Sequence, residues 1–275
     1  MDAFVSVDWL ATHREDSDLV VVDVRDGWEF DGIGHVPGAV NVPFERFRAG
    51  GSDGDGKKAG DGDAEPAGML PGEGVWERLL SAAGVGPEDR LVSYDDTHGV
   101  FAARFAVTAL LYGHPPERLA ALDGDYSAWS RTHETTTEAT AVTGTTYEVD
   151  RPADSPLVGF ETVRTALGEP GTVVLDTREP REYAEGHLPG AAQLDWMALV
   201  DDESRGLRPR EAAESVLADR GVDRDSRVVL YCNTARRISH TYLALRQFGY
   251  ESVDFYEGSL TEWEARGGPV ETGAD

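Results

Sequence analysis

The amino-acid sequence predicts an α/β protein made of two copies of one domain, each a mainly parallel sheet flanked by helices. Three observations predict this fold class. The chain has 275 residues, enough for about two domains. Four blocks of sequence recur in the same order in its two halves. Short runs of Val and Leu alternate with helical patterns in each half, which is typical of strands covered on both faces.

The internal repeat is carried by short motifs. The matching blocks are VVVDVR (20–25) and VVLDTR (173–178), GHVPGA (34–39) and GHLPGA (186–191), LLSAAGVGPEDRLVSYD (79–95) and VLADRGVDRDSRVVLYC (216–232), and LDGDYSAW (122–129) and YEGSLTEW (256–263). We interpret this order as a tandem duplication. The expected organisation is a first domain at 1–134, a Thr-rich linker at 135–156 and a second domain at 157–275.

The elements alternate in each copy. In chain order the first copy is expected to hold a strand at 19–24, a helix at 75–83, a strand at 91–94, a helix at 99–112 and a strand at 119–122. The second copy is expected to hold a strand at 173–176, a helix at 211–220, a strand at 228–231, a helix at 237–248 and a strand at 253–256. Such sheets place their sites at the carboxyl ends of strands, beside helix N-termini.

A segment dense in Gly and Asp, 49–68, is expected to be a solvated insertion in the first domain. The chain has no run of about 18 apolar residues, so no membrane span is expected. The N-terminal residues lack a basic segment followed by an apolar core, so we expect no signal peptide and a cytoplasmic location.

Acidic residues dominate the composition. There are 51 Asp and Glu against 25 Lys and Arg, a net charge of −26, and only Lys57 and Lys58 are lysines. Because this acidity is spread along the chain, we interpret the protein as one from a salt-accumulating cytoplasm, where high ionic strength screens self-repulsion. The alternative is an unusually acidic mesophilic protein. With either interpretation the acidic surface repels nucleic acid and anionic membranes, so we expect neither nucleic acid nor a membrane as a partner.

Cys232 is the only cysteine, which excludes a disulfide within the chain and a Cys-based zinc cluster. It directly follows a predicted strand and opens the segment CNTARR, which leads into a helix. Backbone N–H groups of such a loop and the helix dipole form an anion cradle, in which a sulfur is expected to react as a thiolate. Arg236 and Arg237 add positive charge. The alternative is a small buried core residue.

Three segments carry a family resemblance. They are YAEGHLPGA (183–191), the loop from Cys232 to Arg237, and VDFYEGSLTEW (253–263), in which Leu260 replaces the usual large aromatic residue. With these motifs in order, nearly the whole chain resembles the rhodanese family, specifically the tandem-domain thiosulfate and 3-mercaptopyruvate sulfurtransferases.

The resemblance implies a catalytic second domain and a first domain that has lost its nucleophile, since Asp95 stands where Cys232 is expected to match. It implies that Cys232 is catalytic: its thiolate takes the sulfane sulfur of a donor, becomes a persulfide, and passes the sulfur to cyanide or a thiol. The substrate-binding residues it implies are Asn233, Thr234, Ala235, Arg236 and Arg237. No cofactor or metal is implied. The expected partners are a small-molecule donor and acceptor, with a protein thiol as a further candidate acceptor.

Alternatives remain for the reaction. Two arginines in the loop favour dianionic thiosulfate over 3-mercaptopyruvate as donor. Phosphatases of the same fold place five residues between Cys and Arg, whereas four separate Cys232 from Arg237, and a non-catalytic module of this fold would lack the Cys. In tandem relatives a substrate-binding Arg often occupies the position of Glu182; here Arg181 precedes it.

Six residues in repeated motifs are expected to be structural. Asp176 and Arg178 should form an ion pair that braces the loop after their strand, as Asp23 and Arg25 should in the first copy. The histidines of the two GHxPGA turns, His35 and His187, are expected to stabilise those turns, because both copies have them and only one can be catalytic.

Overall fold

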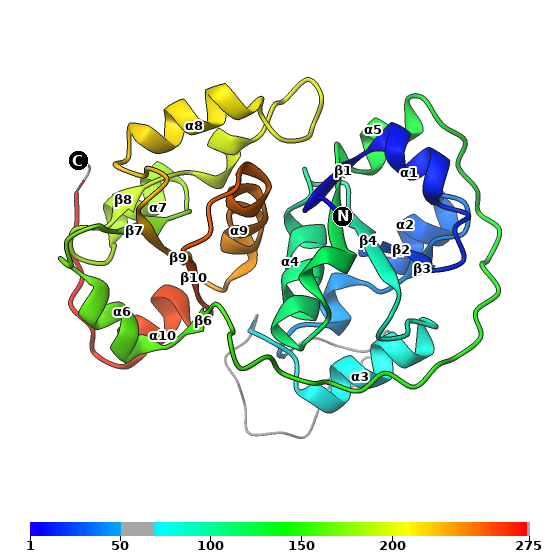
Figure 1. Cartoon of the computed structure of the whole chain (residues 1–275), viewed down its shortest axis with the longest axis horizontal. Coiled ribbons are helices and arrows are strands. Elements are labelled where there is room, and N and C mark those ends of the chain that lie inside the picture. The colour runs from blue at the N-terminus through cyan, green and yellow to red at the C-terminus, as the bar shows by residue number, and fades with distance from the viewer. Residues whose placement is uncertain (51–68, 274–275) are drawn as a thin grey trace. The chain divides into compact units, whose positions relative to one another are not determined.

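The computed structural model describes residues 1–50 and 69–273 (Figure 1). Apart from Ala49 and Gly50, the insertion expected at 49–68 lies outside the described residues. Contacts divide the chain into two compact units, Met1–Ser155 with Asp202–Gly206, and Pro156–Asp201 with Leu207–Asp275. The domain limits expected from the sequence stay a prediction.

The first unit holds a five-stranded sheet in the order β1-β5-β4-β2-β3, in which every paired strand is parallel. Its elements are β1 (Phe4–Ser6), α1 (Val7–His13), β2 (Leu19–Asp23), α2 (Gly27–Gly32), β3 (Val40–Asn41), the 3-10 turn η1 (Phe44–Arg46), α3 (Glu73–Ala82), β4 (Arg90–Tyr94), α4 (Val100–Leu111), the 3-10 turn η2 (Pro116–Arg118), β5 (Leu119–Asp123) and α5 (Asp125–Ser130).

The second unit repeats this architecture with the sheet order β6-β10-β9-β7-β8, again parallel throughout. Its elements are β6 (Leu157–Val158), α6 (Phe160–Ala166), β7 (Thr172–Asp176), α7 (Pro180–Glu185), β8 (Ala192–Gln193), the 3-10 turn η3 (Trp196–Leu199), α8 (Arg210–Ala218), β9 (Arg227–Tyr231), α9 (Arg236–Phe248), β10 (Val253–Tyr256) and α10 (Ser259–Ala265). Two parallel five-stranded sheets with flanking helices confirm the predicted fold class.

The burial of the central strands explains their nearly continuous apolar sequence pattern. In β4 and β9 every residue after the first is buried, because helices cover both faces of the sheet. A large aromatic residue closes each core: Trp129 in α5 and Trp263 in α10 are fully buried, and each indole N–H donates to a backbone carbonyl a few residues onward. The buried indole donors are therefore satisfied without interrupting the apolar packing.

The strands that the sequence analysis missed are short ones. β3, β6 and β8 have two residues each and β1 has three, too few for a periodic signal. The Thr-rich stretch after His133 has no helix, and its backbone bonds to the first unit: the N–H groups of Thr145 and Tyr147 donate to the carbonyl and hydroxyl oxygens of Ser81. No helix within the described residues is long and apolar enough to cross a membrane.

Candidate active site

Cys232 lies immediately after β9, at the carboxyl end of the central strand. Its backbone N–H donates to Ser259 Oγ at 3.1 Å, and its carbonyl oxygen accepts from the N–H of Leu260 at 3.0 Å. Both acceptor and donor belong to the start of α10. The residue is 2% exposed. Two hydrogen bonds to the start of α10 therefore hold the backbone of Cys232, and they fix the position of its Cα.

The five residues after Cys232 form one turn between strand and helix. Asn233, Thr234 and Ala235 make the loop, and Arg236 and Arg237 are the first two residues of α9. Ala235 adopts a left-handed conformation with φ of 63°, which turns the chain sharply into the helix. The structure thus brings all the sequence-predicted site residues together at the N-terminus of a 13-residue helix, where the helix dipole is positive.

The matching loop in the first unit shows what such a turn can hold. Asp95 follows β4, and its buried carboxylate accepts four backbone hydrogen bonds. Oδ1 accepts from Thr97 at 2.7 Å and Gly99 at 2.9 Å, and Oδ2 accepts from Phe101 at 2.7 Å and Ala102 at 3.1 Å. Burial raises the pKa of Asp95, and the four N–H donors oppose that rise. In the first unit the anion cradle is filled by a carboxylate of the chain itself.

The two loops differ in length. α4 begins at Val100, five residues after Asp95, whereas α9 begins at Arg236, four residues after Cys232. The longer loop has two residues with positive φ, His98 at 55° and Gly99 at 80°, where the shorter loop has Ala235 alone. The first unit therefore carries the wider turn.

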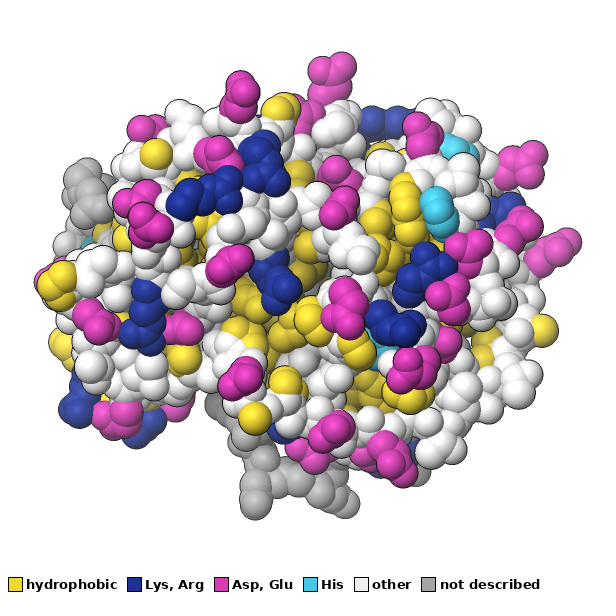
Figure 2. Space-filling model, in the orientation of Figure 1, with side chains coloured by type: hydrophobic (Ala, Val, Ile, Leu, Met, Phe, Trp, Pro, Cys, Tyr) yellow, Lys and Arg dark blue, Asp and Glu magenta, His cyan; other side chains and the backbone are white. Residues whose placement is uncertain are grey.

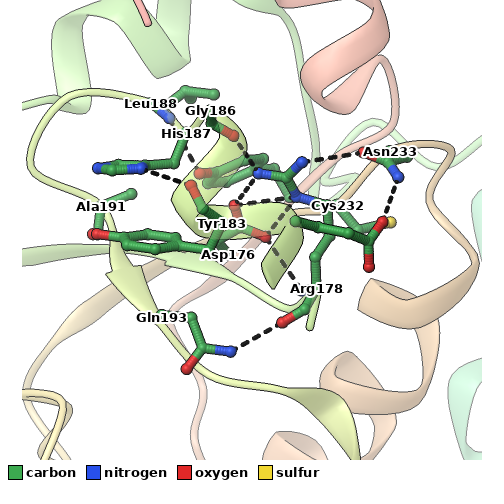
Figure 3. A network of polar contacts seen from close by, with 12 residues as sticks. Asp176, Arg178, Tyr183, Gly186, His187, Leu188, Ala191, Gln193, Cys232 and Asn233 are labelled. Carbon is green, nitrogen blue, oxygen red and sulfur yellow. Dashed lines mark hydrogen bonds and ion pairs between the residues drawn. The ribbon is translucent and has the colours of Figure 1, made fainter. Parts of the chain in front are cut away.

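A buried ion pair braces the start of the site in each unit, as expected from the sequence. Arg178 donates to both carboxylate oxygens of Asp176, with Nη2 and Oδ2 2.6 Å apart, and also to the carbonyl oxygen of Gly186 (Figure 3). Arg25 and Asp23 repeat this arrangement. Both pairs are almost wholly buried, so each holds the loop after its strand in one conformation.

The second unit extends this pair into the candidate site. Arg178 Nη1 donates to Asn233 Oδ1 at 3.3 Å, as Figure 3 shows beside Cys232. Asn233 Nδ2 in turn donates to Glu182 Oε1 at 2.8 Å, and Arg237 Nη1 donates to Glu182 Oε2 at 2.6 Å. One continuous polar network therefore runs from the end of β7 to the first turn of α9.

Glu182 is the residue of this network that sequence reasoning did not connect to the loop. Its partial burial would raise its pKa, but the hydrogen bond and the charge of Arg237 outweigh burial and hold the pKa below its usual value. The carboxylate is therefore ionised at neutral pH, and it compensates the charge of Arg237. The sequence signal was an acidic residue at a position where tandem relatives often have Arg, and nothing in the sequence shows that Arg237 reaches it.

Arg181 is not part of the network. Its side chain is 87% exposed and pairs with Glu185 at 3.0 Å, one helical turn along α7. His187 has the structural contacts expected for a turn residue: Nδ1 lies 2.9 Å from the carbonyl oxygen of Tyr183, and the ring stacks on the Tyr183 ring at 3.7 Å. His35 makes the same two contacts with Phe30. Among the described residues, no group of three His, Cys, Asp or Glu side chains is arranged to hold a metal ion.

The Rhodanese-like domain family matches two segments, residues 6–132 and 160–266, which include both loops. The chain belongs to the rhodanese family. A thiosulfate sulfurtransferase of Pseudomonas aeruginosa is 32% identical over 90% of this chain and 88% of its own length. A putative thiosulfate sulfurtransferase of Haloferax volcanii is 29% identical over 99% of this chain and 97% of its own length.

Solved structures of this rhodanese's fold include EanB, which is 16% identical with a TM-score of 0.81 and covers 99% of this chain and 70% of the EanB chain. An anaerobic ergothioneine biosynthesis enzyme of Chlorobium limicola, in complex with trimethyl histidine, is also 16% identical, with a TM-score of 0.83 over 99% of this chain and 71% of its own. At this identity the similarity establishes the fold alone.

Proposed function

We propose that this rhodanese is a sulfurtransferase that moves the sulfane sulfur of thiosulfate to a thiophilic acceptor, cyanide or a thiol, through a persulfide on Cys232. The observation that carries the proposal is the pair of matching loops, each between a central strand and the helix that follows it. One holds a carboxylate in four backbone hydrogen bonds, and the other places a cysteine at the matching position.

The two side chains have similar reach when the cysteine carries sulfur. Beyond Cβ, an aspartate has one atom and then its charged oxygens, and a cysteine persulfide has Sγ and then a charged terminal sulfur. A cradle of converging N–H groups that suits the carboxylate of Asp95 also suits a persulfide on Cys232. The loop N–H groups from Asn233 to Arg237, which open α9, supply the donors in the second unit.

The first half-reaction is a displacement at sulfur. The Cys232 thiolate attacks the outer sulfur of thiosulfate, a new S–S bond forms, the S–S bond of the donor breaks, and its electron pair leaves with sulfite. Charge balances, because a thiolate and a dianion become a persulfide anion and a dianion. In the second half-reaction the acceptor attacks the terminal sulfur, and Cys232 is released as a thiolate. Neither step consumes a cofactor.

One contact favours 3-mercaptopyruvate as a second candidate donor. Two loop arginines predict a preference for the dianion thiosulfate, but Arg237 is ion-paired with Glu182 at 2.6 Å. Glu182 therefore compensates part of the charge of Arg237. This reduces the advantage that a second negative charge gives to thiosulfate as donor. The names of the relatives from P. aeruginosa and H. volcanii support thiosulfate. The ratio of kcat/KM for the two donors decides between them.

The deciding experiment follows sulfur on Cys232. After incubation with thiosulfate, the intact protein should gain the mass of one sulfur atom, and cyanide should remove it as thiocyanate. Cys232→Ser should release neither sulfite nor thiocyanate while its circular dichroism stays that of the unchanged protein. Turnover of Cys232→Ser near that of the unchanged protein would contradict the mechanism. Release of phosphate from a phosphate ester instead of sulfur transfer would support the phosphatase alternative.

We also propose that the protein works in a salt-rich cytoplasm. Asp and Glu side chains are scattered over the face seen in Figure 2, in keeping with a net charge of −26. A charge of this size disfavours the folded state at low ionic strength through self-repulsion. Stability that rises with KCl is the measurable consequence.

A further inference from the structure

We propose that Glu182 is a specificity residue that sets how strongly the Cys232 loop favours a doubly charged sulfur donor over a singly charged one. The inference rests on the proposed sulfur transfer at Cys232. Glu182 is on α7, and it reaches across to Asn233, the first loop residue after Cys232, and to Arg237, the second residue of α9.

The contacts place the carboxylate of Glu182 beside the loop. Asn233 directly follows Cys232, and Arg237 lies in the first turn of α9, whose N-terminus faces the loop. Glu182 accepts from both at 2.8 and 2.6 Å. The side chains of Arg237 and Glu182 are 17% and 26% exposed, so the pair lies at the border between the loop and solvent. A donor that approaches Cys232 experiences both charges.

The charges of this pair act on an anionic donor in opposite directions. Arg237 attracts it and Glu182 repels it, and the repulsion doubles when the donor carries two charges instead of one. Glu182 also holds the Asn233 amide, whose Oδ1 is bound by Arg178. A purely structural role would alter all donors alike, whereas a charge role changes the ratio between donors of different charge.

The first unit offers a matched control. Glu29 and Glu182 occupy the same place, the third residue of a helix with a capping box, and each accepts from the backbone N–H at the start of its own helix. The first turn of α4 has Val100 and Phe101 where α9 has arginines. Glu29→Gln therefore makes the same change in capping and in net charge in a unit whose matching positions hold neither the loop cysteine nor the helix arginines.

The test compares two donors that break the same kind of S–S bond. Thiosulfate is a dianion and releases sulfite; methanethiosulfonate is a monoanion and releases methanesulfinate. In Glu182→Gln the ratio of kcat/KM for thiosulfate to that for methanethiosulfonate should rise about three- to five-fold, and the rise should shrink as KCl is raised. Arg237→Gln should lower the ratio, and the double variant should return it to that of the unchanged protein. Glu29→Gln should leave it unchanged.

A second measurement does not depend on sulfur transfer. Since Cys232 is the only cysteine, alkylation reports on it alone. The rate with anionic iodoacetate relative to neutral iodoacetamide should rise about three- to five-fold in Glu182→Gln and stay constant in Glu29→Gln. If the unchanged protein transfers sulfur from neither donor, the proposed function fails while the alkylation ratio still tests Glu182. Equal ratios in Glu182→Gln and the unchanged protein, in either measurement, overturn the proposal.

Discussion

Replacing Asp95 by Asn should destabilise the first unit more than its conservative nature suggests. The carboxylate of Asp95 accepts four backbone N–H groups, two on each oxygen. An Asn side chain has one acceptor oxygen, so it satisfies two of the four and turns an NH₂ group toward the other two. Each buried donor left without an acceptor costs about 1–3 kcal/mol, and relief from burying a charge offsets part of this. We expect a net loss of about 2–4 kcal/mol in the free energy of unfolding.

Hydrogen exchange gives the assay its resolution within the loop. One pair of amides, either Thr97 with Gly99 or Phe101 with Ala102, should lose protection in Asp95→Asn, and urea unfolding followed by Trp fluorescence gives the free energy. The control is Asp96→Asn, which makes the same change one residue along. Asp96 accepts one backbone N–H, from Ser127 at 3.1 Å, and forms a partly exposed ion pair with Arg205 at 3.5 Å. Asp96→Asn should therefore lower the free energy of unfolding by about 1 kcal/mol or less. Equal losses in the two variants would refute the reasoning.

Three further predictions concern ion pairs and salt. Asp176→Asn leaves the buried guanidinium of Arg178 without its carboxylate, so the free energy of unfolding should fall by about 3–5 kcal/mol in urea titrations; Asp23→Asn should behave alike, and a loss below about 1 kcal/mol in both would contradict a structural role. Because the pKa of folded Glu182 is below its usual 4.5, its ionised form stabilises the fold above that pH, and this stability disappears as pH falls through the folded value. The difference in thermal midpoint between Glu182→Gln and the unchanged protein should therefore be constant above about pH 5 and should decrease toward zero in more acidic buffer. A difference that stays the same at low pH would contradict a stabilising role for ionised Glu182. Raising KCl from about 0.1 to 1 M shortens the screening length from about 10 to 3 Å, so the thermal midpoint should rise, and a midpoint independent of KCl would contradict the salt-adapted interpretation.

The sequence alone determined the fold class and the position of the candidate site. Runs such as RVVLY before Cys232 are apolar at every position after the first, because a central parallel strand is buried on both faces, and that makes them recognisable without a partner strand. The site follows from the same order: a residue just after a central strand and just before a helix must lie at the carboxyl edge of the sheet. The loop from Cys232 to Arg237 was therefore predictable as one turn.

Tertiary structure alone decided what surrounds that turn. The bond between Glu182 and Arg237 joins residues 55 positions apart on two helices, and no local pattern encodes it. The direction of an arginine side chain depends on which acceptor the fold brings within reach. The sequence therefore shows that the loop has two arginines, but it does not show that Glu182 compensates the charge of Arg237. Likewise, the sequence predicted that Asp95 stands at the position of the cysteine, whereas its four hydrogen bonds exist because the loop and the first turn of α4 direct their N–H groups toward its carboxylate.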